Sequence, residues 1–148
     1  MRRILHTMTN TNTEHIDPKI AAVGRMYQAL GRGDIDAILT EVADDVDWVS
    51  VTPNGSPTVP WYGSYQGRSD VPRFFKEITT NATITEFSPL SFTSNDTDVM
   101  VALVWGITIH TTGKQITLPM QHWFRFANGK VTVVRTAEDS EQTAAAFT

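Results

Sequence analysis

One histidine of this chain is placed where a side chain could bind and orient an oxygen atom. His122 alternates with Met120 and Phe124, so in a strand it would share their apolar face. Burial lowers the pKa of an imidazole and keeps it neutral, with one nitrogen donating and the other accepting. We therefore expect His122 to orient a carbonyl or enol oxygen. The alternative is a core histidine that bonds to a backbone carbonyl.

Large aromatic side chains would form the walls around such a group, because they are bulky hydrophobes that also serve as platforms for a ligand. Trp48 shares a strand face with Ser50, and Trp105 shares one with Leu103, so these side chains are expected to line a pocket. The other residues expected there are Met26, Phe74, Met120, Phe124, Val134 and Thr136.

Composition excludes several kinds of chemistry. The chain has no cysteine, which excludes thiol catalysis, thiolate zinc sites and disulfides. His110 and His122 lack a convergent acidic third ligand, and His6 and His15 fall in the N-terminal lead, so no metal is predicted. No glycine-rich loop has phosphate-cradling spacing, and we expect no cofactor. With 12 basic and 16 acidic side chains, a net charge of −4 and no basic run, nucleic acid is not an expected partner.

The length of 148 residues, 41% of them hydrophobic, is typical of one domain. Residues 1–16 are expected to form a disordered lead and residues 17–148 the domain. The N-terminus begins like a signal peptide, but His6 and Thr7 interrupt its apolar stretch. No apolar window approaches the ~20 residues of a membrane span. We therefore expect a cytoplasmic protein that does not contact a membrane.

Helices are predicted in the first half of the domain and strands in the second. Asp17 and Pro18 are typical of a helix start, and apolar residues then recur at helical spacing up to Gly31 and Gly33. Further predicted helices cover residues 35–42, 71–78 and 140–147. Predicted strands cover residues 46–52, 83–92, 98–110, 115–126 and 131–138, and residues 53–67 form a predicted loop. This order indicates an α+β domain in which a strongly bent, antiparallel sheet wraps the helices and leaves a pocket.

Several motifs occur in the order and spacing of a known superfamily. They are Gly-Asp-Ile-Asp-Ala-Ile at 33–38, Ala-Asp-Asp-Val at 43–46, Val-Pro-Trp-Tyr-Gly-Ser-Tyr-Gln-Gly-Arg at 59–68, Phe-Phe at 74–75, Thr-Gly-Lys at 112–114, His-Trp-Phe-Arg-Phe-Ala-Asn-Gly-Lys-Val at 122–131 and Glu-Asp-Ser-Glu-Gln-Thr-Ala-Ala-Ala-Phe at 138–147. With them the chain resembles the nuclear transport factor 2-like superfamily, in particular its SnoaL-like polyketide cyclases and ketosteroid isomerases.

This resemblance implies a cystatin-like, cone-shaped α+β barrel with an internal pocket. Three N-terminal helices would pack on a strongly curved, mixed and mostly antiparallel sheet. It also implies that Trp61 and Tyr62 lie at the pocket mouth. A homodimer would pair through the outer sheet face, where Trp123 is expected.

The resemblance to ketosteroid isomerase can be compared residue by residue. In that enzyme a helix tyrosine and a protonated aspartic acid bind the steroid oxygen, while a second aspartate moves the proton. The matching positions hold, in that order, Met26 with Tyr27 beside it, His122 and Ser50, and two supporting tyrosines match Val42 and Phe75. A serine hydroxyl is a poor base without an activating partner, so steroid isomerisation by that mechanism is not expected.

In the SnoaL-like cyclases the acid–base carboxylate resembles Asp139, with Glu138 beside it. Side chains alternate along a strand, so Glu138 faces the pocket if Val134 and Thr136 do, and Asp139 then points away unless a bulge intervenes. Asp139 is equally suited to cap the predicted tail helix. Both interpretations stay open at this point.

These residues together predict a protein that binds a small hydrophobic molecule. As an isomerase or cyclase it would use His122 to polarise an oxygen, Glu138 or Asp139 as the base, and Tyr27 or Ser50 as a supporting donor. The alternative is a binding or interaction protein of the same fold without catalysis, which the apolar residues at positions 26, 42 and 75 favour.

Overall fold

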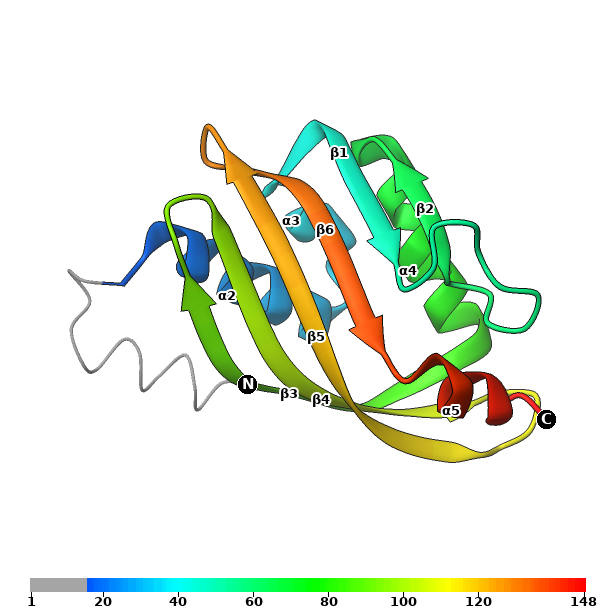
Figure 1. The fold of residues 1–148 in the computed structure, drawn as a ribbon. Helices are drawn as coiled ribbons and strands as arrows, with labels where there is room; N and C mark the ends of the chain where they lie inside the picture. Colours follow the sequence, from blue (N-terminus) through cyan, green and yellow to red (C-terminus); the bar gives the residue numbers. More distant parts are fainter. Residues whose placement is uncertain (1–15) are drawn as a thin grey trace.

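The computed structural model describes residues 16–148, which form helices and one sheet (Figure 1). The helices are α2 (Pro18–Arg32), α3 (Ile35–Leu39), α4 (Val71–Asn81) and the tail helix α5 (Ser140–Ala145), with a 3-10 turn at Arg68–Asp70. Within these residues no helix is both long and apolar enough to cross a membrane. Residues 1–15, and with them His6, His15 and most of the predicted lead, lie outside the described part of the chain.

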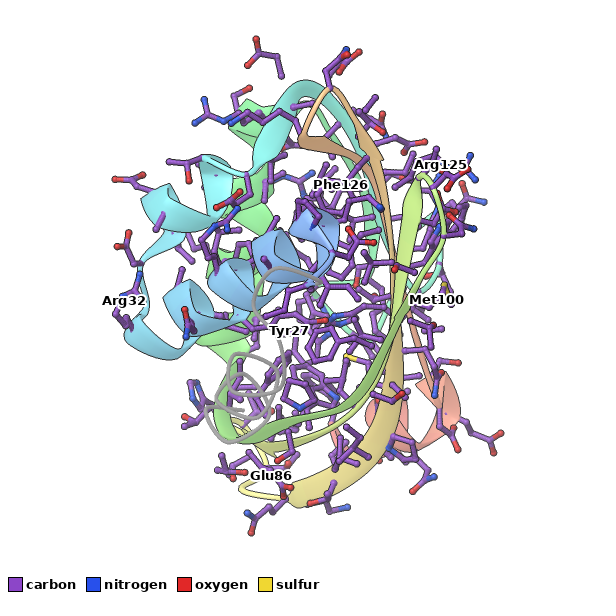
Figure 2. All side chains as sticks on the ribbon, turned by 90° about the vertical axis from the view of Figure 1, so that its left-hand side faces the viewer. Tyr27, Arg32, Glu86, Met100, Arg125 and Phe126 are labelled. Carbon is purple, nitrogen blue, oxygen red and sulfur yellow. The ribbon has the colours of Figure 1, made fainter. Side chains whose placement is uncertain are left out.

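A six-stranded sheet forms the other layer. Its strands are β1 (Val42–Ser50), β2 (Gly63–Gln66), β3 (Ala82–Ser94), β4 (Asp98–Ile109), β5 (Gln115–Ala127) and β6 (Lys130–Glu138). They lie in the order β2-β1-β6-β5-β4-β3, with β1 and β6 parallel and the other neighbours antiparallel. The sheet bends strongly, and α2, α3 and α4 lie against one face (Figures 1 and 2). The predicted α+β fold with a strongly curved, mixed sheet is confirmed, and the sheet is not closed into a barrel.

Local sequence signals fix the ends of the first helices. Asp17 accepts a hydrogen bond from the backbone N–H of Lys19 and so caps α2. Gly33 ends α2 with a φ of 69°, a left-handed conformation that glycine adopts without strain. Asp34 caps α3 through the backbone N–H of Ala37. The two helices are therefore joined by one short turn.

Two element boundaries differ from the prediction. Gly63–Gln66, expected in a loop, forms the edge strand β2, in which Tyr65 is buried. So short a segment shows too little alternation to predict a strand. Val42, expected to end the second helix, instead begins β1, where it pairs with Val131. A register shift between Val42 and Asp47 breaks the simple alternation along β1.

The apolar core lies between the helices and the inner face of the sheet (Figure 2). Tyr27 of α2 and Phe74, Phe75 and Ile78 of α4 are buried there. Each amphipathic helix buries one side, and that side faces the sheet. The core between helices and sheet therefore contains apolar side chains from both. An internal ligand site must therefore lie between the two layers.

The outer face of the sheet carries an apolar and an aromatic side chain next to each other. Met100 is 46% exposed and is the register partner of Trp123. The Trp123 indole donates to Asp98 at 2.8 Å, and the Arg125 guanidinium lies over its ring. A homodimer that pairs through this face stays a prediction.

We expect the chain to sediment as a dimer and Met100→Glu to shift it toward the monomer, because a buried unpaired charge at an interface is costly. Gln28→Glu adds the same charge on an exposed position of α2 and is the matched control. A monomeric wild-type protein at micromolar concentration, or equal effects of the two substitutions, would contradict pairing through this face.

Gly106 of β4 fits beside a bulge in β3. A Cβ atom at this position would lie 3.0 Å from Thr85 Oγ1 and 3.3 Å from Glu86 Cβ, next to the register shift between Ile84 and Glu86. We expect Gly106→Val to lower the free energy of unfolding by roughly 1–3 kcal/mol in urea titrations. Ala102→Val, at an exposed position of the same strand, should change it by less than about 0.5 kcal/mol. Equal losses would contradict this steric account.

Candidate ligand-binding and active site

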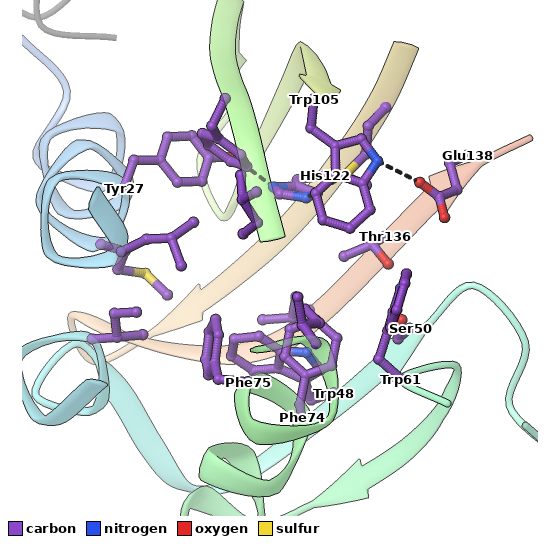
Figure 3. Close-up of a pocket in the computed structure, with 18 of the residues that line it drawn as sticks. Tyr27, Trp48, Ser50, Trp61, Phe74, Phe75, Trp105, His122, Thr136 and Glu138 are labelled. Atoms are coloured by element: carbon purple, nitrogen blue, oxygen red, sulfur yellow. Dashed lines mark hydrogen bonds between the residues drawn. The ribbon is translucent and has the colours of Figure 1, made fainter. Parts of the chain in front are cut away.

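A cavity of about 70 Å³ lies between the helices and the sheet (Figure 3). Its walls are mostly apolar, as binding sites for small organic molecules usually are. The predicted ligand-binding residues that line it are Met26, Trp48, Trp61, Phe74, Trp105, Met120, Phe124, Val134 and Thr136. The predicted catalytic residues that line it are Tyr27, Ser50, His122 and Glu138.

Strand register places the polar groups of the sheet in neighbouring rows. Ser50 pairs with Thr136, and Thr136 pairs with His122, so two hydroxyls and the imidazole form one row across β1, β6 and β5. Glu138 pairs with Met120 in the next row. Diagonal neighbours on such strands lie roughly 7–8 Å apart. One small molecule can therefore contact His122 and Glu138 together.

The imidazole of His122 is held between the two layers of the protein. Its Nδ1 lies 2.7 Å from the hydroxyl oxygen of Tyr27, which comes from α2. Its Nε2 lies 3.1 Å from the thioether sulfur of Met120 on the same strand. Figure 3 shows Tyr27 and His122 facing each other at one side of the pocket.

These contacts determine which ring nitrogen carries the proton. Burial raises the pKa of Tyr27 well above its usual value, so the phenol keeps its hydrogen and can donate to Nδ1. Nε2 then carries the ring proton and donates it toward Met120. In the other tautomer an unprotonated Nε2 would face a sulfur that has no hydrogen to offer. The geometry therefore selects the Nε2–H form.

Burial also sets the charge of this ring. It lowers the pKa of His122 to about 3, so the imidazole is neutral near pH 7. A thioether is a weak acceptor, which leaves the Nε2–H available to a better one. A carbonyl or enolate oxygen entering the cavity would be such an acceptor.

Glu138 is a half-buried carboxyl group at the end of β6. Its Oε1 accepts a hydrogen bond from Trp105 Nε1 at 2.8 Å (Figure 3). Its Oε2 accepts from the hydroxyls of Tyr62 at 2.6 Å and Thr143 at 3.0 Å. Burial raises the pKa of Glu138, and the three donors, which favour the charged form, offset this only in part. A carboxyl group shifted in this direction is better matched to proton exchange near neutral pH.

Three predicted site residues lie outside the cavity lining. Asp139 caps α5 by accepting from the backbone N–H of Gln142 at 3.0 Å, and it is exposed, so we assign it no catalytic role. Strand β6 has no bulge at this end, so side chains alternate regularly between its two faces. Glu138 therefore shares the pocket face of Val134 and Thr136, and Asp139, the next residue, does not. Tyr62 donates a hydrogen bond to Glu138, which lines the cavity. Leu103 is buried in the core beside Met120.

Several lining residues were not predicted to face the pocket, and they come mostly from helices and from β3. They are Leu30, Ile38, Val51, Phe75, Ile78, Ile84 and Phe87. Thr143, which donates to Glu138, is also absent from the prediction. Helical periodicity marks a buried face but does not say which part of that face borders a cavity.

Within the described range 16–148, no group of three or more His, Asp or Glu side chains is arranged to hold a metal ion. His110 is exposed and bonds through its ring nitrogens to the Thr83 hydroxyl and the Thr80 carbonyl, both at 2.9 Å. It therefore stabilises the end of a hairpin and takes no part in the pocket.

Comparison with known families gives one match over most of the chain. The model of the SnoaL-like domain matches residues 23–134. No curated protein matches the chain significantly.

Many solved structures share the fold. An NTF2-like protein of unknown function from Burkholderia pseudomallei is 23% identical, with a TM-score of 0.82, over 90% of this chain and 99% of its own. TerC, co-crystallised with polyporic acid, is 23% identical with a TM-score of 0.78, and the match covers 88% of this chain and 98% of TerC. A "putative polyketide cyclase" from Xanthomonas campestris pv. campestris is 23% identical with a TM-score of 0.74, and the match covers 88% of this chain and 97% of that protein. At this identity the likeness establishes the fold alone.

The lowered pKa of His122 predicts a specific pH dependence of stability. In the unfolded chain the His122 side chain binds a proton below about pH 6.5. In the folded protein it stays unprotonated until the pH approaches its lowered pKa of about 3. The free energy of unfolding should therefore fall as the pH drops through this window, by up to about 1.4 kcal/mol per pH unit from this group. Urea titrations at pH 7 and about pH 5 measure it.

His122→Asn should lose this contribution, so its pH dependence should be shallower than that of the wild-type protein. His110→Asn removes an exposed histidine and is the matched control, which should keep the wild-type slope. An unchanged slope in His122→Asn would show that the ring is not held neutral by burial.

Proposed function

This chain belongs to the SnoaL-like domain family, and on that premise we propose that it binds a small, mainly apolar molecule and moves a proton beside its carbonyl or enol oxygen. One observation carries the proposal. A neutral histidine with an available N–H and a half-buried carboxyl group with a raised pKa line the same cavity. An oxygen-binding donor beside a base is what carbon–proton transfer next to a carbonyl requires.

His122 would bind the oxygen. Its Nε2–H donates to the carbonyl, and the hydrogen bond strengthens as negative charge develops on that oxygen in an enolate-like transition state. Tyr27 keeps the ring in the donating tautomer through its bond to Nδ1. Because Tyr27 acts through His122, it is a positioning residue in this scheme.

Glu138 would carry the proton. Its carboxylate takes a proton from the carbon next to the carbonyl, and the electron pair of the broken C–H bond passes to the enolate oxygen held by His122. In an isomerisation, the protonated Glu138 returns the proton to a different carbon. In a cyclisation, the enolate carbon attacks an electrophilic carbon of the same molecule, and Glu138 returns the proton to the alkoxide that forms. Both sequences restore the starting protonation state of the protein.

The hydroxyls of Ser50 and Thr136 offer further contacts for a polar part of the ligand, because they share a sheet row with His122. Ser50 is 1% exposed and lines the cavity. A structural neighbour, the "putative polyketide cyclase" from Xanthomonas campestris, supports this class of ligand and reaction.

A second candidate function is ligand binding without catalysis. Both oxygens of Glu138 already accept hydrogen bonds from side chains of this protein. A carboxylate held in this way is a weaker base if none of these bonds is released. The pocket would then store or carry an apolar molecule.

Exchange of the α-protons of 1-tetralone in D2O, followed by NMR, separates the two functions. We expect the wild-type protein to accelerate exchange above the buffer rate and Glu138→Gln to lose about 10²–10⁴-fold of that acceleration. Asp139→Asn is the matched control, since asparagine also caps helices, and it should retain the wild-type rate. Binding of 1-tetralone without accelerated exchange would reject proton transfer and favour the binding function.

A further inference from the structure

We infer that the ligand carries a second acceptor oxygen, which binds the indole N–H of Trp48 across the pocket from His122. This inference rests on the proposed function in one respect, the placement of the first oxygen at His122. It narrows the ligand class to apolar ring compounds with two neutral oxygen groups on opposite sides.

The indole N–H of Trp48 has no hydrogen-bond partner in the part of the chain that the structure describes. Trp48 is 4% exposed, and its Nε1 is the one buried side-chain nitrogen or oxygen among residues 16–148 that lacks a hydrogen bond. Leaving a buried donor unpaired costs free energy, and such groups are uncommon in folded proteins. The indoles of Trp105 and Trp123, by contrast, both donate to carboxylates at 2.8 Å.

Packing holds the Trp48 ring against the cavity. The Trp48 ring lies 5.4 Å from the ring of Phe74 and 5.8 Å from that of Phe75, measured between centroids. Both phenylalanines come from α4, and all three side chains line the cavity. Figure 3 shows these rings on the side of the pocket opposite His122 and Trp105. An indole is only a donor, so the missing partner must be an acceptor.

The strand register separates the two donors. Trp48 lies on β1 in the row of Val134, and His122 lies on β5 in the row of Thr136. Strand β6 runs between β1 and β5, and the two residues also lie one row apart, so their backbones are separated by roughly 11–12 Å. Because their rings also lie on opposite sides of the pocket (Figure 3), a single oxygen atom does not bridge the two N–H groups. A ring system with an oxygen at each end does.

The charge of the lining favours neutral oxygen groups. The described residues that line the cavity include no lysine or arginine, and burial keeps His122 neutral. Glu138 is the acidic group of the lining, so a carboxylate on the ligand would be repelled and would lose its hydration without compensation. Carbonyl oxygens accept from an indole or imidazole N–H at a lower desolvation cost.

Two probe compounds that differ by one carbonyl test the inference. Tetralin-1,4-dione has oxygens at both ends of its substituted ring, and 1-tetralone has one. We expect the wild-type protein to bind the dione about tenfold more tightly in calorimetric titrations, because one added hydrogen bond in a buried site has about that effect. Trp48→Phe should remove this preference, and Trp123→Phe, which changes an indole on the outer face, should keep it.

Nuclear magnetic resonance of the wild-type protein tests the same contact without any substitution. The indole ¹H–¹⁵N signal of Trp48 should move downfield with the dione and much less with 1-tetralone, as expected when a free N–H gains an acceptor. This measurement stays decisive if Trp48→Phe fails to fold. An unmoved Trp48 signal, or equal affinity for the two probes, would overturn the inference and would mean that water or nothing meets this N–H.

The outcomes are separable from those of the proposed function. If 1-tetralone binds without accelerated proton exchange while the dione moves the Trp48 signal, proton transfer is rejected and the second oxygen site stands. If exchange is accelerated but the dione shows no advantage, the proton transfer stands and the second oxygen site is rejected.

Discussion

An imidazole removed from water requires a hydrogen-bond partner for each nitrogen, and the candidate site follows from how this chain meets that requirement. Burial makes the charged form of His122 costly, so the ring is neutral and its nitrogens differ. Tyr27 satisfies Nδ1 with a short bond, whereas the contact of Nε2 is the weakly accepting thioether of Met120. One nitrogen is thus fixed and the other is available, which makes the ring a preorganised donor in a largely apolar cavity.

The fold provides this arrangement from two separate layers. Tyr27 stands on α2 and His122 on β5, so their bond exists only because the curved sheet brings its inner face up to the helix. The phenol is held by neighbouring rings, with Phe87 at 5.0 Å and Phe124 at 6.2 Å between centroids. The same rings exclude water, and hydrogen bonds are electrostatically stronger in such surroundings than in water.

The sequence predicts those features of the site that depend on strand alternation. Residues two apart share a face, so the inward positions of His122 and Glu138 follow from their apolar neighbours and from the parity of β6. The Tyr27–His122 bond joins residues 95 positions apart, and no local pattern encodes such a contact. The unpaired N–H of Trp48 could not be predicted from the sequence either, because it depends on which groups lie near this nitrogen in the folded protein. Strand β2 is missed for a different reason, since it is short and held by pairing with β1.

Nitrogen-15 NMR of the His122 side chain is the decisive experiment for this site, because it reports the protonation of each ring nitrogen separately. At about pH 6, where an ordinary histidine is largely protonated, we expect a neutral ring with the proton on Nε2 and an unprotonated, hydrogen-bonded Nδ1. A charged imidazolium at that pH, or a neutral ring with its proton on Nδ1, would contradict this expectation.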